Sequence, residues 1–347
     1  MNFFQGDAQF YCGVDLHTKA MYLCILDAGG RVVLHKNLPT RPDAFLDAVE
    51  PFRQELVVGA ECVFPWYWLA DLCADEGIEF VLGHALYMKA IHGGKAKNDR
   101  IDSEKIVRIL RGGTFPLAYV YPSSMRPTRD LLRRRTYLVR RRAEALTHIQ
   151  NTNSQYNLPP FTKRIDRASN RVGVVDRFED PSVRANIQID LDMLDQYDRV
   201  IRQLELSLVR RARIDDPTTY HLLRTVTGIG KVLALIIMYE IHDIARFPRV
   251  QDFVSYCRLI KCDKESAGKK YGYSGKKIGN AHLKWAFSEA TCLMMRDSAE
   301  AKKFVERRTK KHGKGKAMSI LSARIGRAVY IILKRKMPFE PALFFAH

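Results

Sequence analysis

Three short apolar runs near the N-terminus constrain the fold of this chain more than any other feature. The runs FYCGVDL, AMYLCIL and RVVLHKNL follow one another within residues 10–38. The turn-forming residues DAGG at Asp27–Gly30 lie between the second run and the third. Runs of this length joined by short turns predict three strands, arranged as an antiparallel meander.

Beyond the meander, apolar strands alternate with helical segments. Residues 55–60 (ELVVGA) predict a fourth, buried strand that ends at Glu61, and Ile78–Leu82 predicts a fifth. Helical spacing of apolar residues is found over Pro42–Phe52, Pro65–Glu76 and Asp102–Arg111. The order β-β-β-α-β-α-β-α is that of a ribonuclease-H-like domain, so we predict an α/β domain over residues 1–120.

Four acids each stand at the end of one of these predicted elements. Asp15 lies near the end of the first strand, Glu61 follows the fourth strand, and Asp99 and Asp102 lie at a helix start. In this topology the first and fourth strands are neighbours, and a spacing of three puts Asp99 and Asp102 on one helix face. Clustered carboxylates hold hard divalent cations, and a pair of such ions clamps the attacking and leaving oxygens of a phosphodiester. We therefore predict a catalytic Mg²⁺ site, which Mn²⁺ can also fill.

Single residues in this group also have simpler explanations. Asp102 alone fits an acid in the first turn of a helix, where the helix dipole favours it. Nearby Lys95, Lys97 and Arg100 either neutralise a scissile phosphate or balance the acids within the fold.

The distribution of charge favours a polyanionic partner. The formal net charge is +19. Residues 1–115 carry 12 Lys and Arg against 15 Asp and Glu, whereas the rest of the chain carries 45 against 23. This asymmetry indicates nucleic acid rather than a membrane, because no apolar run approaches the roughly 20 residues of a spanning helix. With no basic and apolar leader and no CxxC pair, we expect a cytoplasmic, nucleoid-associated protein with reduced thiols.

Residues 121–215 predict a helical region that joins subunits or binds RNA. Residues 126–150 and Ile187–Arg213 have helical spacing and suggest a helical hairpin or a coiled coil, with Leu158-Pro159-Pro160 breaking the first helix. The first helix carries two arginine triplets seven residues apart and without balancing acids, which favours contact with a phosphate backbone over a solvated face. The triplets are Arg133, Arg134, Arg135 and Arg140, Arg141, Arg142.

Residues 216–347 predict a third, mainly helical domain. Tyr220–Val226, the turn TGIG and Lys231–Ile241 resemble a helix-hairpin-helix, in which Gly228 and Gly230 let backbone N–H groups approach a phosphate. A plain helix turn is the alternative. The glycines, serines and lysines before Asn280 predict a flexible basic loop, and Lys302–Lys316 predicts a basic tail broken by glycine.

Several of these motifs together resemble one transposase family. GVDLHTK at 13–19, the glutamate after VVGA and AKNDRIDSEKIVRIL at 96–110 resemble the RuvC-like domain of DEDD transposases. TVTGIGKVLALIIMYEI and KESAGKKYGYSGKKIGNAHLKWAF resemble the transposase domain of the same family. This is the IS-one-ten insertion-sequence family of bridge-RNA-guided recombinases, to which the pilin-gene invertase is related. The resemblance covers essentially the whole chain.

The resemblance implies a mechanism and partners. A serine of the second domain would attack DNA and form a covalent intermediate, in a composite centre with the four acids. Ser266 matches this serine best, and Ser274 is the runner-up. Donor and target DNA, a bridge RNA and a dimer or tetramer are the implied partners. Lysines of the same loop would bind phosphate, namely Lys264, Lys269, Lys270, Lys276 and Lys277.

Two other functions remain open from the sequence. One is a nuclease of the Holliday-junction type, which hydrolyses DNA with metal and water and needs no serine. The other is a nucleic-acid architectural protein without catalysis, whose acids are structural. His17 and His282 are expected to pack or to bind phosphate rather than to act as bases.

Overall fold

The computed structural model describes residues 2–91, 98–274 and 278–346. The chain forms two compact units, Met1–Ser124 and Met125–His347. The predicted middle region therefore shares a unit with the predicted C-terminal domain, and the functional division of the chain into three parts stays a proposal.

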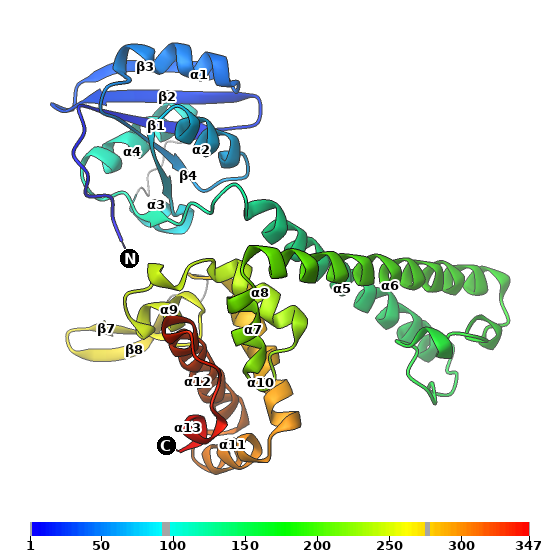
Figure 1. Cartoon of the computed structure of the whole chain (residues 1–347). Coiled ribbons are helices and arrows are strands. Elements are labelled where there is room, and N and C mark those ends of the chain that lie inside the picture. The colour runs from blue at the N-terminus through cyan, green and yellow to red at the C-terminus, as the bar shows by residue number, and fades with distance from the viewer. Residues whose placement is uncertain (1, 92–97, 275–277, 347) are drawn as a thin grey trace. The chain divides into compact units, whose positions relative to one another are not determined.

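The first unit is built on a six-stranded sheet in the order β3-β2-β1-β4-β5-β6. Figure 1 labels the strands β1 to β4 of this sheet. The first three strands are antiparallel and form the predicted meander, while β4 runs parallel to both β1 and β5. The strands are β1 (Phe10–Leu16), β2 (Ala20–Asp27), β3 (Val32–Pro39), β4 (Leu56–Glu61), β5 (Glu79–Gly83) and the two-residue β6 (Leu117–Ala118). The predicted neighbourhood of the first and fourth strands is confirmed.

Helices cover both faces of this sheet, and the alternation of side chains decides which face each residue joins. Cys12, Val14 and Leu16 of β1 pack with α1 and α2. Tyr11 lies on the opposite face with α4. The helices are α1 (Pro42–Val49), α2 (Trp66–Asp75), α3 (Ala85–Ile91) and α4 (Asp99–Arg111). The short α3 and β6 were not predicted, and α4 begins three residues before the predicted start.

Two glycines let α4 approach the sheet closely. A Cβ on Gly13 would lie 2.5 Å from the Ser103 carbonyl oxygen and 2.5 Å from the Val107 nitrogen, both in the backbone of α4. A Cβ on Gly59, which is in register with Gly13 on β4, would meet the Leu110 side chain at 3.0 Å. Because Gly13 and Gly59 have no side chain, α4 can pack close to the sheet, and this sets the position of the start of α4.

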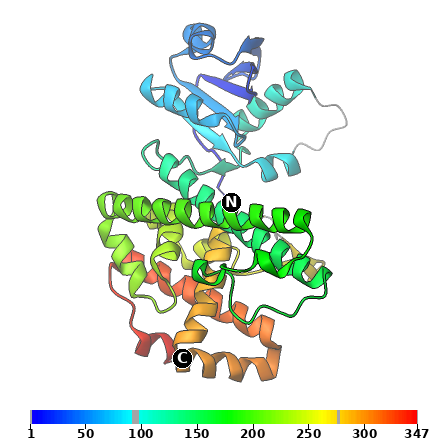
Figure 2. The same ribbon diagram turned by 90° about the vertical axis from the view of Figure 1, so that its right-hand side faces the viewer.

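The second unit begins with two long helices that run side by side (Figures 1 and 2). They are α5 (Arg126–Gln155) and α6 (Pro181–Asp215). Their outer parts share a small core with the segment that connects them, whereas Leu132, Leu208 and Ala212 belong to the main core of the unit.

The other helices of this unit include α8, whose last nine residues are all buried. They are α7 (Pro217–Thr225), α8 (Lys231–Ile241), α9 (Val250–Tyr256), α10 (Ala281–Asp297), α11 (Ala299–His312), α12 (Lys314–Arg335) and α13 (Pro341–Phe345). Within the described residues, no helix has the length and apolar character needed to cross a bilayer.

Two predictions for this unit are wrong. The segment expected to be a flexible loop forms an antiparallel hairpin, with strands β7 (Cys262–Ser266) and β8 (Lys269–Ser274). The expected basic tail is helical, because α11 runs to His312 and α12 starts at Lys314. The Ala, Glu, Lys and Arg residues of α11 are strong helix formers, so glycine interrupts the helix only at Gly313.

Candidate metal centre and nucleic-acid contacts

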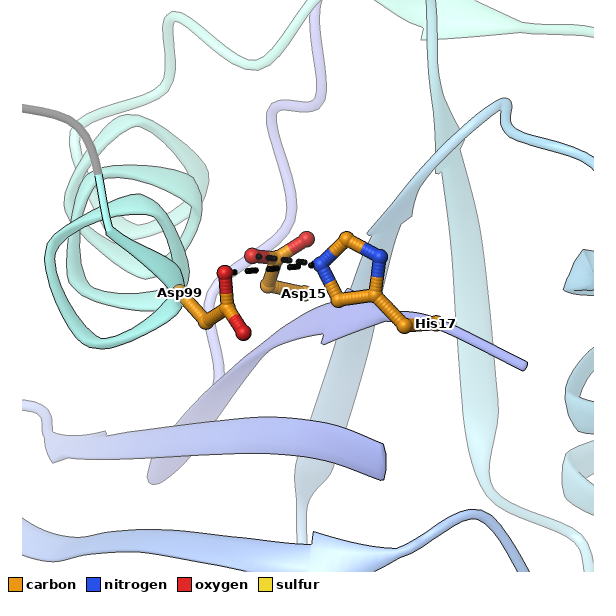
Figure 3. A group of neighbouring side chains, drawn as sticks. All are labelled: Asp15, His17 and Asp99. Carbon is orange, nitrogen blue, oxygen red and sulfur yellow. Dashed lines mark ion pairs between the residues drawn. The ribbon is translucent and has the colours of Figure 1, made fainter. Parts of the chain in front are cut away.

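Asp15, His17 and Asp99 form a compact cluster in the first unit (Figure 3). The imidazole Nε2 of His17 lies 3.4 Å from a carboxylate oxygen of Asp15 and 3.6 Å from one of Asp99. One ligand atom of each residue lies within 4.8 Å of the other two. Asp99 comes from the first turn of α4, whereas Asp15 and His17 come from the end of β1 and the turn after it.

Sheet register explains why acids meet at this edge. Asp15 and Glu61 directly follow the register pair Val14 and Ala60 on two parallel strands. Each is also two residues beyond a glycine that α4 covers, so both acids belong to the α4 face of the sheet. The prediction from topology that they converge at one edge agrees with this register.

The start of α4 is fixed by a side-chain cap. Asn98 precedes the helix, and its Oδ1 accepts a hydrogen bond of 2.8 Å from the Ile101 nitrogen. The helix therefore begins at Asp99, and its dipole favours negative charge in this first turn. The cap places Asp99 and Asp102 one turn apart on the side that faces β1 and β2.

The electrostatics of Asp15 suit a cation site. Burial raises the pKa of Asp15 above its ordinary value, His17 opposes this, and the charges of Asp99 and Asp102 raise it further. The Asp15 side chain is 17% exposed, while those of His17 and Asp99 are 55% and 61% exposed. A cation can therefore reach the cluster from solvent and would relieve the repulsion between its carboxylates.

The other two predicted acids lie beside this cluster and outside its tight group. The Asp102 carboxylate lies 3.4 Å from the Lys105 ammonium, one turn along α4. Glu61 is half-buried at the end of β4. Lys95 and Lys97, which we considered as phosphate contacts, lie outside the described residues.

His17 was not predicted from the sequence to belong to the metal site. Its signal was the motif DLH, because residues 15 and 17 of an extended chain project to the same side. Two hydrogen bonds hold His17 in the short turn to β2. The backbone N–H of His17 donates to the Ala20 carbonyl, and the Thr40 hydroxyl donates to the His17 carbonyl.

Ser266 lies next to the tip of the β7–β8 hairpin. It pairs with Lys269 across a two-residue turn, Ala267-Gly268, whose residues both have positive φ. Turns of this kind match the twist of antiparallel strands. Ser266, Lys269 and Lys270 are all exposed. Lys276 and Lys277 lie outside the described residues, and the side chains of Lys264 and Ser274 are not described.

The premise that the arginine triplets of α5 lack balancing acids is wrong. Arg133 is paired with Glu240, Arg135 with Glu205, and Arg142 with Asp198. These acids lie 56–107 residues away along the chain, and packing of the helices brings them to α5. The paired arginines are partly buried and connect helices, so charge balance gives no reason to place them on phosphate.

The remaining three arginines of the two triplets are exposed. Arg134 and Arg141 lie 4.9 Å and 5.0 Å from the centre of the Tyr137 ring, which is itself exposed. Arg141 also pairs with Glu144 on the same helix. Contact of Arg134, Arg140 and Arg141 with nucleic acid stays a proposal.

The glycine turn between α7 and α8 has a structural explanation for one of its residues. Gly228 has a φ of +89°, and a Cβ there would lie 2.4 Å from the Ala290 carbonyl oxygen of α10. Gly230 is exposed at the start of α8, and a Cβ there would meet nothing within 4 Å. Packing thus accounts for Gly228, and phosphate binding at this turn stays a proposal.

Comparison with known families agrees with the order of these units. A DEDD transposase model, described as Transposase, matches residues 12–157. A second model, described as Transposase IS116/IS110/IS902 family, matches residues 220–306. No curated protein matches the chain. These two matches place the chain among the DNA-processing enzymes of the transposase class. The chain belongs to the IS110 (IS-one-ten) family of insertion-sequence transposases, which use divalent metal and act on DNA.

Proposed function

We propose that this transposase cleaves and exchanges DNA strands with the acid site and a serine nucleophile, under the guidance of a bridge RNA. The observation that carries the proposal is the meeting of Asp15 and Asp99 around one imidazole nitrogen, at the edge where β4 also ends in Glu61. Acids that gather in this way on an α/β sheet fit phosphoryl transfer rather than structural support.

The residues present fit a divalent cation. Asp15 and Asp99 offer carboxylate oxygens, the ligands that Mg²⁺ and Mn²⁺ prefer, and His17 offers a nitrogen that Mn²⁺ also accepts. Glu61 and Asp102 are proposed to complete the set from the adjacent strand end and the next helical turn. A cation bound there would supply a Lewis acid for the phosphate oxygens.

Ser266 is proposed as the nucleophile. Its hydroxyl is exposed beside a tight turn, where a DNA strand can reach it. The Oγ forms a bond to phosphorus while the bond from phosphorus to one sugar oxygen breaks. The serine gives up its proton and the leaving sugar oxygen takes up a proton, so the step needs no co-reactant. Attack by a sugar hydroxyl of another strand then releases the serine and joins the new ends.

Basic residues close to Ser266 support this role. Lys269 faces it across the turn, and Lys270 follows on the same strand. Cationic groups near a reacting phosphate stabilise the charge that develops in the transition state. A dimer or tetramer is proposed as the working form, because strand exchange must hold several DNA ends at once.

A strand-transfer assay tests the proposal. Purified protein, its flanking noncoding RNA, donor DNA and target DNA are incubated with Mg²⁺, and protein-linked DNA is sought after digestion with protease. We expect an adduct that is absent in Ser266→Ala and in Asp102→Ala. Ser319→Ala is the matched control, because this exposed serine of α12 donates its hydroxyl to the Gly315 carbonyl of its own helix.

One competing function has its own support. Asp15, His17 and Asp99 all belong to the first unit, so a metal-dependent nuclease that uses water as its nucleophile needs nothing from the hairpin. Free cleaved ends without an adduct, retained in Ser266→Ala, would establish that nuclease. Binding without any strand breakage would instead indicate an architectural protein.

A further inference from the structure

A buried carboxylate in the second unit stands at the centre of a polar network. Glu240 of α8 is 2% exposed, in a helix that is apolar apart from Lys231 and the Tyr239 hydroxyl. It accepts hydrogen bonds from Arg129 and Arg133 of α5 and from Asn280 at the start of α10. A buried charge is costly unless it is fully paired, and here two arginines and one amide pair the carboxylate.

Asn280 connects this network to the hairpin that carries Ser266. Its Oδ1 caps α10 by accepting from the His282 and Leu283 nitrogens, while its Nδ2 donates to Glu240 at 2.7 Å. Its backbone N–H donates to the Tyr256 carbonyl at the end of α9, also at 2.7 Å. One side chain thus fixes the point at which the chain returns from the hairpin.

The two ends of the hairpin segment are also held to each other. The chain leaves α9 through Arg258, whose Nε donates to the Gly279 carbonyl at 2.8 Å. A Cβ on Gly279 would lie 2.5 Å from the Tyr256 carbonyl oxygen, and its φ of +92° suits glycine. The outgoing and returning segments therefore meet at a narrow base, which the Arg258 side chain and a backbone hydrogen bond from Asn280 to Tyr256 hold together.

We propose that Glu240 and Asn280 are positioning residues for Ser266, which hold the base of the β7–β8 hairpin against α5 and α8. The inference rests on the proposed role of Ser266 as nucleophile. An exposed two-stranded hairpin has little core of its own, so its direction depends on how its base is held. The network anchors the base through Asn280 and bonds it to two arginines of α5. Arg133 was predicted from the sequence to contact phosphate, and it has a structural role in this network instead.

The proposal is tested by swapping the carboxylate of Glu240 and the amide of Asn280. Asn280→Asp keeps the cap of α10 but sets a second carboxylate against Glu240, so the base should loosen. Glu240→Gln removes the negative charge that Arg129 and Arg133 share. The double variant Glu240→Gln with Asn280→Asp restores one amide, one carboxylate and two arginines in exchanged places. Rescue by this double variant cannot result from a general loss of stability.

Asp198→Asn is the matched control. Asp198 is also a carboxylate shared by two arginines, Arg142 and Arg171, but it belongs to the outer part of the α5–α6 pair. Its removal should lower the unfolding temperature without changing the hairpin.

Two measurements on the full-length variants separate the outcomes. Hydrogen exchange over residues 256–282, which include the Asn280 amide, reports on the base of the hairpin, and protein-linked DNA reports on Ser266. We expect Asn280→Asp to speed exchange and to lower adduct yield about 10- to 100-fold, and the double variant to recover both.

Unchanged exchange in Asn280→Asp, the same response in Asp198→Asn, or no recovery in the double variant would overturn the inference. If the unaltered protein forms no adduct while exchange responds as expected, the proposed nucleophile is wrong but the anchoring of the hairpin stands. If the adduct depends on Ser266 yet stays unchanged in folded Asn280→Asp, the nucleophile stands and the positioning role is wrong.

Discussion

Arg133 binds the Glu240 carboxylate with two hydrogen bonds, Nε to Oε1 at 2.7 Å and Nη2 to Oε2 at 3.0 Å. Burial alone would raise the pKa of Glu240, but the hydrogen bond from Arg133 and the charges of Arg129 and Arg133 lower it to about 2. Arg133, which was predicted from the sequence to contact phosphate, is thus bound to a buried carboxylate of its own unit.

Lowering the pH should destabilise the second unit, because it protonates Glu240 in its pair with Arg133. A carboxyl whose folded pKa lies below its unfolded value stabilises the fold above the unfolded pKa. This contribution disappears as the pH falls from about 4.5 toward about 2. We expect the free energy of unfolding to decrease across this window and the decrease to be smaller in Glu240→Gln. Denaturant unfolding between pH 6 and pH 2 checks this, and identical slopes would contradict it.

Removal of either central acid should abolish metal binding without unfolding the protein. We expect Mg²⁺ to raise the unfolding temperature of the unaltered chain, because it relieves repulsion among carboxylates. Asp15→Asn and Asp99→Asn should abolish this gain and reduce DNA cleavage by at least about 100-fold. Asp43→Asn is the control, since Asp43 is an exposed acid of α1 that pairs with Arg41. An equal effect in the control would place the metal elsewhere.

We expect His17 to stabilise the two carboxylates in the metal-free protein and not to be an essential ligand of the cation. Its Nε2 lies within 3.6 Å of a carboxylate oxygen of both Asp15 and Asp99, and its interaction with Asp15 opposes the rise in the pKa of that carboxyl. His17→Ala should therefore lower the unfolding temperature of the metal-free protein and enlarge the gain on adding Mg²⁺. Thermal unfolding with and without Mg²⁺ measures both. A smaller gain in His17→Ala would show instead that the imidazole binds the metal.

Gly13→Ala should displace the helix that carries two of the acids. The added methyl would lie 2.5 Å from backbone atoms of Ser103 and Val107, and backbone cannot rotate away as a side chain can. We expect about 1–3 kcal/mol of destabilisation, together with weaker Mg²⁺ binding. Gly315→Ala is the control, because a Cβ there meets nothing within 4 Å. Unaltered metal affinity in Gly13→Ala would show that the acids do not depend on this close approach.

The exposed and paired arginines of α5 should behave differently. Changing Arg134, Arg140 and Arg141 together to alanine should weaken nucleic-acid binding and lower the salt slope of log K by about 0.9 for each phosphate that is no longer neutralised. Arg135→Ala should instead destabilise the protein by about 1–3 kcal/mol, because it leaves Glu205 unpaired between helices. Binding titrations at several salt concentrations, with thermal unfolding, distinguish the two groups. A binding defect confined to Arg135→Ala would reverse the assignment.

Local patterns in the sequence were sufficient for five of the six strands of the sheet and for part of the site. Apolar strands with tight turns identified the meander, and the topology that they imply placed the ends of β1 and β4 together. On this basis Asp15 and Glu61 were predicted to converge, which agrees with the register of β1 and β4. The tight group that the structure forms is Asp15 with His17 and Asp99. Three-residue spacing likewise placed Asp99 and Asp102 on one face of α4.

The hairpin at Cys262–Ser274 could not be predicted from apolar periodicity. Its residues are mostly polar, and pairing of Ser266 with Lys269 depends on a turn in which two residues have positive φ. Gly268 favours such a turn, whereas Ala267 does not indicate it. Composition therefore indicated a loop where strand pairing forms.

The order of the first five strands can be predicted from the amino-acid sequence alone. The same is true of the position of each acid at the end of an element and of the excess of positive charge beyond residue 115. Which of these charges remain available to a partner depends instead on long-range packing. Arg133 and Glu240 are 107 residues apart, and the packing of α5 against α8 brings them together. His17 lies beside Asp99 for a similar reason, because the end of β1 packs against the start of α4, which is distant in the sequence. Patterns of spacing describe neighbours along the chain, whereas the pairing of buried charges is determined by which helices share a core.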